Sequence, residues 1–208
     1  MDDGVSAVTE RFELTTTDGE TLEARWDSPE EPQFTTVFCH PSPVEGGSMM
    51  APLMIAVTQK LVARGHSVLR FNFRGVGSST GDYGGGDTET ADVDAAVSVA
   101  SDRSDSVGIA GWSFGAAVAM NWLIENESGI PYVGIAPPTK LIDGKPPTGP
   151  RRIILGSREQ VIDSDALKAF AIDNGIDLVI TPGDHFFHGR GKRIGDLVGE
   201  GLEANGSG

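Results

Sequence analysis

Ser113 stands between two glycines in the segment GWSFG, which has the pattern G-x-S-x-G. Where a buried strand precedes this pattern and a helix follows it, the serine occupies a sharp turn that presents its Oγ as a nucleophile. Here the apolar run 107–112 precedes the serine, and an alanine-rich run follows it. A chance glycine-serine turn is the simpler alternative, but the flanking runs favour a nucleophilic serine.

A serine hydroxyl needs a base to accept its proton, and the sequence has four histidines. His185 follows the last expected strand in the segment TPGDHFFHG, and the chain order serine, acid, histidine favours it as the base. His188 is the alternative, unless it is a solvated surface residue. His40 precedes the serine in the chain, and His66 leads into a strand, where a structural role is expected.

A carboxylate should complete this arrangement by fixing the imidazole tautomer and stabilising its cation. The loop after the expected strand 151–157 offers Glu159, Asp163 and Asp165. Glu159 is closest to the end of the strand and is the preferred acid. Asp163 remains the alternative, although it directly precedes an expected helix, where capping is the simpler role.

An oxyanion formed during acyl transfer needs two fixed N–H donors. The backbone of Phe114, the residue after the serine, should supply one of them. The loop after an early strand should supply the other, but Pro41 and Pro43 have no N–H to donate. Ser42 is therefore the first donor expected there, with Val44 as the next.

The elements that position these residues can be read from apolar patterning. Alternating residues around Asp18-Gly19 predict an N-terminal β-hairpin. Further strands are expected at 35–39, 67–75, 106–112, 132–138, 151–157 and 177–183, and helices at 49–64, from 87 or 88 to about 100, 114–126, 164–174 and 186–203. Strands that alternate with helices predict a mostly parallel central sheet covered by helices on both faces.

Two of these helices carry specific expectations. The helix over 49–64 should turn one apolar face inward, made of Met50, Leu53, Met54, Val57 and Leu61. The next helix should begin with a side-chain cap from Asp87 or Thr88. Its inward face should hold Val93, Ala96, Val97 and Ala100.

Length and charge restrict the class of protein. The 208 residues fit a single domain over 1–208, with residues 1–10 and 204–208 expected to be frayed. A formal net charge of −14 argues against nucleic-acid and anionic-membrane partners. The acidic N-terminus has no apolar signal segment, no run is long enough to span a membrane, and a cytoplasmic location is expected. The acidity and the scarcity of lysine fit a surface adapted to high salt, with a moderately acidic mesophilic protein as the alternative.

Four stretches, CHPSPVEGGSM, RFNFRGVGSSTG, GWSFGA and GDHFFHG, resemble the α/β-hydrolase superfamily in order and spacing. The resemblance is closest to its small esterase-like and dienelactone-hydrolase-like members. It implies an α/β-hydrolase fold without a lid domain, Ser113 as nucleophile, His185 as base, and Ser42 and Phe114 as oxyanion donors. The family's usual acid is an aspartate where this chain has Glu159, and the serine nucleophile does not imply the cysteine chemistry of true dienelactone hydrolases.

The sequence therefore predicts a serine hydrolase that cleaves a carboxylic ester or thioester of a small acyl substrate through an acyl-enzyme. No metal or organic cofactor is expected, because no cluster has ligand spacing. The expected partner is a small molecule, and an exposed edge strand could support a homodimer. The alternatives are a peptidase-type hydrolase or a non-catalytic binding or scaffold protein on the same fold, because fold alone does not fix function.

Overall fold

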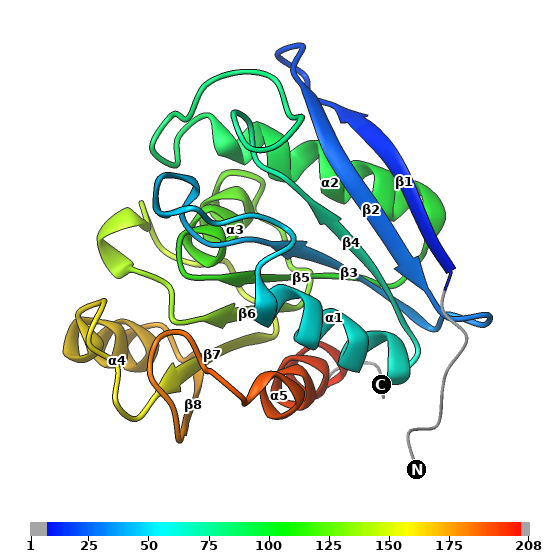
Figure 1. The fold of residues 1–208 in the computed structure, drawn as a ribbon. Helices are drawn as coiled ribbons and strands as arrows, with labels where there is room; N and C mark the ends of the chain where they lie inside the picture. The colour runs from blue at the N-terminus through cyan, green and yellow to red at the C-terminus, as the bar shows by residue number, and fades with distance from the viewer. Residues whose placement is uncertain (1–7, 205–208) are drawn as a thin grey trace.

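Eight strands form one sheet in the computed structural model, which describes residues 8–204 (Figure 1). They are β1 (Val8–Thr15), β2 (Thr21–Ser28), β3 (Phe34–Cys39), β4 (His66–Phe71), β5 (Val107–Trp112), β6 (Tyr132–Ile135), β7 (Arg151–Gly156) and β8 (Asp177–Thr181). Their order across the sheet is β1-β2-β4-β3-β5-β6-β7-β8. The strands from β3 to β8 pair in parallel, whereas β1 and β2 pair antiparallel. The sheet is mostly parallel, as predicted.

The N-terminal hairpin turns at Asp18-Gly19, as the sequence indicates. Gly19 has φ 95°, a left-handed conformation that glycine adopts readily. The first residues of β1 pair with the end of β2, so that Val8 lies opposite Ser28. This part of the expected frayed end therefore belongs to a strand. Residues 1–7 and 205–208 lie outside the described part of the chain.

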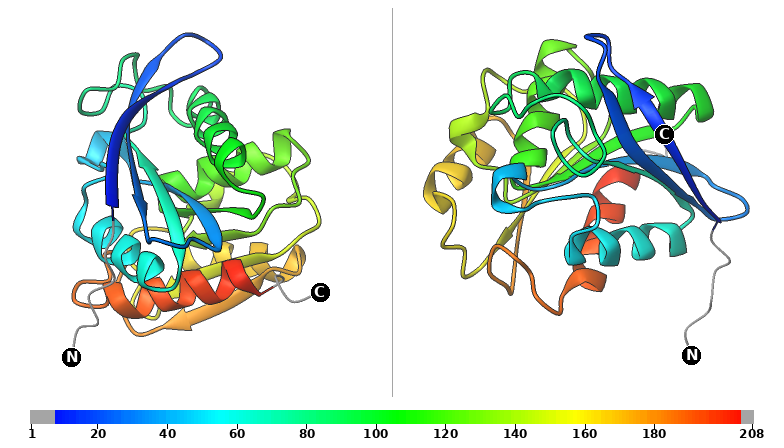
Figure 2. Two further views of the ribbon diagram at one scale, coloured as in Figure 1. Left: turned by 90° about the vertical axis from the view of Figure 1, so that its right-hand side faces the viewer. Right: turned by 45° about the horizontal axis from the view of Figure 1, so that its top comes forward.

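Helices cover both faces of the sheet (Figure 2). They are α1 (Pro52–Ala63), α2 (Glu89–Arg103), α3 (Phe114–Glu125), α4 (Ser164–Asp173) and α5 (Gly191–Glu203). One apolar cluster joins α1 and α5 to one face of the sheet, and a second cluster joins α2, α3 and α4 to the other face. All six residues of β4 are buried, as expected for a strand covered on both sides.

The segment between β6 and β7 holds one short 3₁₀ turn, η2 (Thr139–Leu141). No further helix or strand interrupts this connection in the described chain. This agrees with the expected absence of a lid domain.

The first helix begins later than predicted, at Pro52 rather than Met49. Proline favours the first helical position, and it disfavours the helical conformation in the residue before it. Ala51 accordingly has an extended ψ of 144°. Met50 thus precedes the helix and is 44% exposed, so its predicted inward position is wrong, whereas the other four residues of that face are buried.

The expected side-chain cap of α2 is not formed. Thr88 occupies the cap position, but its backbone is already helical and its side chain caps nothing. The buried carboxylate of Glu89 instead accepts hydrogen bonds from the N–H groups of Gly84 and Gly86, each at 2.8 Å. The preceding loop is therefore tied to the first residue of the helix rather than to its cap.

The last helix also starts later than predicted, at Gly191 rather than Phe186. Asp184 accepts hydrogen bonds from the N–H groups of Phe186 and Phe187, each at 3.1 Å, which closes a turn. Phe187 has φ 49° and Gly189 has φ 69°. These left-handed residues cannot continue a right-handed helix, so residues 186–190 form turns.

Candidate active site

Ser113 lies on the turn that joins β5 to α3. Its backbone has φ 52° and ψ −119°, a conformation that costs a non-glycine residue roughly 1–3 kcal/mol. The turn is fixed by its neighbours, because the Ser113 N–H donates to Ile135 (2.7 Å) and its carbonyl accepts from Ala116 (3.0 Å). The strained strand-to-helix turn has the geometry that presents a serine side chain as a nucleophile.

The two glycines that flank Ser113 permit close packing of the backbone. A Cβ on Gly111 would lie 2.5 Å from the Cα of Ala116. A Cβ on Gly115 would lie 2.3 Å from the carbonyl oxygen of His40. Any larger residue would push the helix away from the sheet or from the loop after β3, so both positions require glycine.

His185 is paired with Glu159 in the structure. The distance from His185 Nδ1 to Glu159 Oε2 is 2.9 Å, and both side chains are at most 5% exposed. The other carboxylate oxygen, Oε1, accepts hydrogen bonds from the N–H groups of Val161 (2.7 Å) and Ile162 (3.3 Å). Because a carboxylate only accepts, Nδ1 carries the imidazole proton and Nε2 is left as the basic nitrogen.

The loops that carry this pair are joined beyond the ends of β7 and β8. Ser157 donates to Thr181 and Arg158 donates to Gly183, each at 2.9 Å. A Cβ on Gly156 would lie 2.7 Å from the Gly183 carbonyl oxygen, so glycine allows this close approach. The indole N–H of Trp112 donates to the His185 carbonyl (3.1 Å) and ties the histidine loop to β5.

The loop after β3 folds back on itself next to Ser113. The Ser42 carbonyl accepts hydrogen bonds from Glu45 (3.2 Å) and Gly47 (2.9 Å), around the short 3₁₀ turn η1 (Pro43–Glu45). Within residues 8–204, neither the Ser42 N–H nor the Phe114 N–H is used in a hydrogen bond. Both groups are therefore available to a ligand.

His40 holds the start of this loop. The Phe73 N–H donates to its Nε2 (3.0 Å), so Nδ1 carries the proton and donates to the Pro41 carbonyl (2.7 Å). Burial lowers the pKa of His40 to about 4, because the charged form would lose its hydration. His40 is thus a neutral structural residue rather than a base.

A cleft of about 330 Å³ opens beside these residues. Its lining consists of Pro41, Ser42, Glu45, Gly46, Gly47, Ala51, Trp112, Ser113, Val161, His185 and Phe186. The structure therefore brings Ser113, His185 and Ser42 to one cleft, with Glu159 behind the histidine. Ser113 and His185 make no direct hydrogen bond among the described side chains, and such catalytic contacts often tighten only when substrate binds.

The alternative residues have other contacts. Asp163 caps α4 by accepting hydrogen bonds from Asp165 (3.1 Å) and Ala166 (2.9 Å). His188 is exposed, and its ring stacks on Phe186 at 5.7 Å. His66 is bonded through its two ring nitrogens to Thr36 (2.8 Å) and Glu203 (2.9 Å). None of these contacts leads to Ser113.

Sequence reasoning did not identify several residues of the cleft, among them Val161, Phe186 and Glu45. Val161 and Phe186 belong to the loops of the paired carboxylate and histidine, and both are about half exposed (52% and 48%). Glu45 ends the 3₁₀ turn after Ser42. Their closeness in sequence to the predicted residues was the available signal, but it does not reveal which side chains turn toward the cleft.

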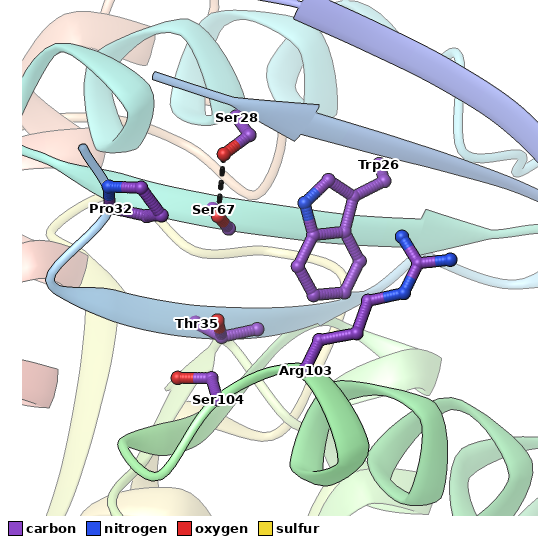
Figure 3. Close-up of a pocket in the computed structure, with 7 residues that line it drawn as sticks. All are labelled: Trp26, Ser28, Pro32, Thr35, Ser67, Arg103 and Ser104. Carbon is purple, nitrogen blue, oxygen red and sulfur yellow. Dashed lines mark hydrogen bonds between the residues drawn. The ribbon is translucent and has the colours of Figure 1, made fainter. Parts of the chain in front are cut away.

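A second cavity, of about 270 Å³, lies at the opposite edge of the sheet, at the amino ends of β3 and β4 (Figure 3). The hydroxyls of Ser28 and Ser67 bond each other there at 2.8 Å. The guanidinium of Arg103 lies 4.7 Å from the ring centre of Trp26 and pairs with Glu10. These polar groups satisfy one another, which is typical of a structural role.

Residues 8–204 contain neither a metal-binding cluster nor a membrane-spanning helix. No three histidine, cysteine, aspartate or glutamate side chains gather there in a way that could hold a metal ion. No helix in the same range has the length and apolar character needed to cross a membrane.

Comparison with known proteins places these features in context. The sequence profile of the alpha/beta hydrolase family matches residues 36–198. An uncharacterized Rickettsia prowazekii protein is 29% identical over 194 residues, which cover 85% of this chain and 81% of that protein.

Solved structures of α/β hydrolases are similar to this chain over more than nine-tenths of its length. An α/β serine hydrolase without a lid from Xanthomonas campestris is 29% identical, with a TM-score of 0.83 and 94% of each chain covered. An α/β serine hydrolase homologue from Coxiella burnetii is also 29% identical, with a TM-score of 0.81 over 93% of this chain and 97% of that one. A Pyrococcus furiosus esterase, at 24% identity, shares the fold with a TM-score of 0.83 over 96% and 94%.

Proposed function

Because the chain belongs to the α/β hydrolase family, we propose that it is a serine esterase with Ser113, His185 and Glu159 as its catalytic triad. One observation carries the proposal. Ser113, on its strained turn, shares a cleft with a histidine whose Nδ1 is held by a buried carboxylate at 2.9 Å. This arrangement leaves Nε2 as the basic nitrogen that can accept a serine proton.

In the proposed reaction, Ser113 Oγ attacks the carbonyl carbon of an ester while His185 Nε2 accepts the hydroxyl proton. The carbonyl oxygen becomes an oxyanion, to which the unused N–H groups of Ser42 and Phe114 can donate. The amino end of α3 adds a favourable field, because helix N-termini carry partial positive charge. His185 then passes its proton to the leaving alcohol, and the carbonyl re-forms as an acyl-serine.

Water completes the second half of the cycle. His185 takes a proton from the water, which attacks the acyl-serine, and returns that proton to Ser113 Oγ as the acid is released. During both steps Glu159 holds the imidazolium and keeps its orientation. Glutamate can fill the place of the shorter aspartate, because two backbone N–H groups anchor its far oxygen.

The size and lining of the cleft support a small acyl substrate. A volume of about 330 Å³ is at the lower end of the range for small-molecule sites. Trp112, Val161 and Phe186 provide an apolar wall next to His185. We propose a carboxylic ester or thioester with a short apolar acyl chain as the substrate.

A panel of p-nitrophenyl esters of increasing chain length tests this function, with wild type compared with Ser113→Ala in high salt. We expect turnover that is highest for short chains and is lost in Ser113→Ala by at least about 10³-fold. Turnover that survives in the variant would show that Ser113 is not the nucleophile. If neither protein turns over ester, a fluorophosphonate probe distinguishes a slow enzyme, whose Ser113 is labelled, from a non-catalytic binding protein.

A further inference from the structure

The cleft contains one charged side chain, and its charge is negative. Among its described lining residues, Glu45 is the only aspartate, glutamate, lysine or arginine. The lining includes residues of the loop from Pro41 to Ala51, among them Glu45. It also includes the aromatic residues Trp112 and Phe186. A substrate in the cleft therefore meets both a carboxylate and aromatic rings, and no lysine or arginine of the lining offsets the negative charge.

The backbone of Glu45 is held firmly in this position. Its N–H donates to Ser42 (3.2 Å), and the next residue, Gly46, donates to Pro43 (3.0 Å). A Cβ on Gly47 would lie 2.2 Å from the Pro41 carbonyl oxygen, so the loop is tightly packed at this glycine. The Glu45 side chain is exposed and makes no hydrogen bond or ion pair with the described residues. Its charge is thus not neutralised by a neighbour.

The charge of Glu45 also acts on Tyr83, which lies next to Phe114. Its ring lies 5.5 Å from that of Phe114. Burial raises the pKa of Tyr83, and the carboxylates of Glu89 and Glu45 raise it further. Glu45 therefore disfavours a negative charge on Tyr83, whose ring lies beside that of Phe114, the residue after the nucleophile.

The aromatic residues of the lining favour cationic or neutral groups. The rings of Trp112 and Phe186 meet edge to face, with centres 6.4 Å apart and an angle of 89°. Aromatic faces attract cations and accept apolar groups, whereas they offer nothing to an anion. The formal net charge of −14 acts in the same direction at long range.

We propose that Glu45 is a specificity-determining residue that restricts the cleft to uncharged or cationic esters and rejects those with a carboxylate or phosphate near the scissile bond. This inference rests on the proposed esterase function. It also narrows that function, because thioesters of phosphate-bearing carriers would be poor substrates. Cationic esters, such as those of amino or quaternary ammonium alcohols, would be favoured over their uncharged carbon analogues.

Two pairs of substrates test the inference. In the first pair, p-nitrophenyl butyrate is compared with mono-p-nitrophenyl glutarate, which carries a carboxylate at the end of its acyl chain. In the second pair, butyrylcholine is compared with 3,3-dimethylbutyl butyrate, its uncharged carbon analogue. The measured quantity is the ratio of kcat/KM within each pair. Every substrate develops the same oxyanion, so any effect of Glu45 on the oxyanion itself cancels in the ratio.

The variants are Glu45→Gln and the matched control Glu125→Gln. Glu125 is exposed at the last residue of α3, about 17 Å along the helix from the site, and its substitution removes the same unit of net charge. We expect Glu45→Gln to raise the relative rate of the anionic ester, and to lower that of the cationic ester, each by about five-fold at low salt. Glu125→Gln should leave both ratios unchanged, and added salt should shrink the difference.

The outcomes separate this inference from the proposed function. If hydrolysis depends on Ser113 but the ratios do not change in Glu45→Gln, the inference on Glu45 is overturned and the proposed function stands. Equal changes in Glu45→Gln and Glu125→Gln would overturn the inference as well, because net charge and not position would then be responsible. If the neutral ester shows no Ser113-dependent hydrolysis, the proposed function fails, and this inference fails with it.

Discussion

His185 Nδ1 lies 2.9 Å from Glu159 Oε2, while the other oxygen of the same carboxylate is bound by the Val161 N–H at 2.7 Å. Both oxygens of the carboxylate are therefore held by hydrogen bonds. Its position depends on the full length of the glutamate side chain, because the backbone of the loop is itself bonded to the strand end at Gly156 (3.2 Å). A change in charge and a change in length at this residue should have separable effects.

Glu159→Gln removes the charge but keeps the length. The glutamine NH₂ cannot accept from Nδ1–H and favours the wrong imidazole tautomer, so we expect kcat/KM to fall by about 10²–10⁴-fold. Glu159→Asp keeps the charge but shortens the reach, and should retain more activity than Glu159→Gln. Ester hydrolysis measured at saturating substrate gives kcat, and at limiting substrate it gives kcat/KM.

Asp163→Ala is the control for Glu159, because Asp163 was the alternative acid. Loss of its cap on α4 should lower the free energy of unfolding by about 1 kcal/mol. Its kcat/KM should stay within about two-fold of wild type, since a cap on a surface helix does not contact the reacting groups. Loss of activity in Asp163→Ala together with an active Glu159→Gln would reverse the assignment.

Ser113→Gly and Ser113→Ala should differ in stability but not in activity. Glycine adopts φ 52° without the Cβ clash that serine and alanine suffer. We therefore expect both variants to be inactive, with the glycine variant unfolding at a free energy about 1 kcal/mol higher than the alanine variant. Equal stabilities in urea unfolding would indicate that the turn is not strained.

The sequence was informative about the site because its residues follow directly after strands. Parallel strands end at the same edge of a sheet, so Ser113 after β5, Glu159 after β7 and His185 after β8 meet once the strand order is known. The pattern around Ser113 also contains the glycines that the turn requires. These relationships are local in sequence, which is why they could be predicted.

What could not be predicted depends on turns rather than on periodic patterns. The two phenylalanines at 186 and 187 look like the start of an amphipathic helix, but the Asp184 side chain and the left-handed Phe187 form a turn instead. The position of Glu45 in the cleft depends on the 3₁₀ turn after Ser42, which has no periodic signal. Turn geometry of this kind follows from tertiary contacts.

Gly115→Ala should be strongly destabilising. The added Cβ would lie 2.3 Å from the His40 carbonyl, and this backbone atom cannot rotate away. We expect a loss of about 2–3 kcal/mol in the free energy of unfolding, as for other overpacked positions. Gly129→Ala is the control, because its Cβ would meet only the Thr148 carbonyl at an ordinary 3.7 Å. A similar small effect in both variants would contradict the close packing of α3 against the loop after β3.

The acidic composition predicts a dependence of stability on salt. With a formal net charge of −14, self-repulsion destabilises the folded chain at low ionic strength. Simple screening is nearly complete by about 0.5 M salt, whereas a salt-adapted surface should gain stability beyond it. We expect Tm to rise by about 5 °C or more between 0.5 and 3 M KCl, corresponding to ~2 kcal/mol. A plateau above 0.5 M would favour a moderately acidic mesophilic protein.

His40 should make stability depend on pH. Its pKa is lowered to about 4 in the folded protein by burial, against about 6.5 when unfolded. Below pH 6.5 the unfolded chain binds a proton that the folded one does not, so stability falls as the pH decreases. The contribution is fully present above pH 6.5 and is lost between pH 6.5 and 4, by about 1.4 kcal/mol per pH unit and ~3 kcal/mol in all.

The variant His40→Gln isolates this contribution from that of other titrating groups. A glutamine oxygen can still accept from the Phe73 N–H, which donates to His40 Nε2 at 3.0 Å. The variant should be less stable at pH 7.5, because it loses ring packing against Phe73. Urea unfolding of both proteins at fixed KCl between pH 7.5 and 4 should show a shallower slope for the variant. Parallel curves would mean that His40 is protonated in the folded protein. The interpretation that a neutral imidazole holds the Ser42 loop would then be wrong.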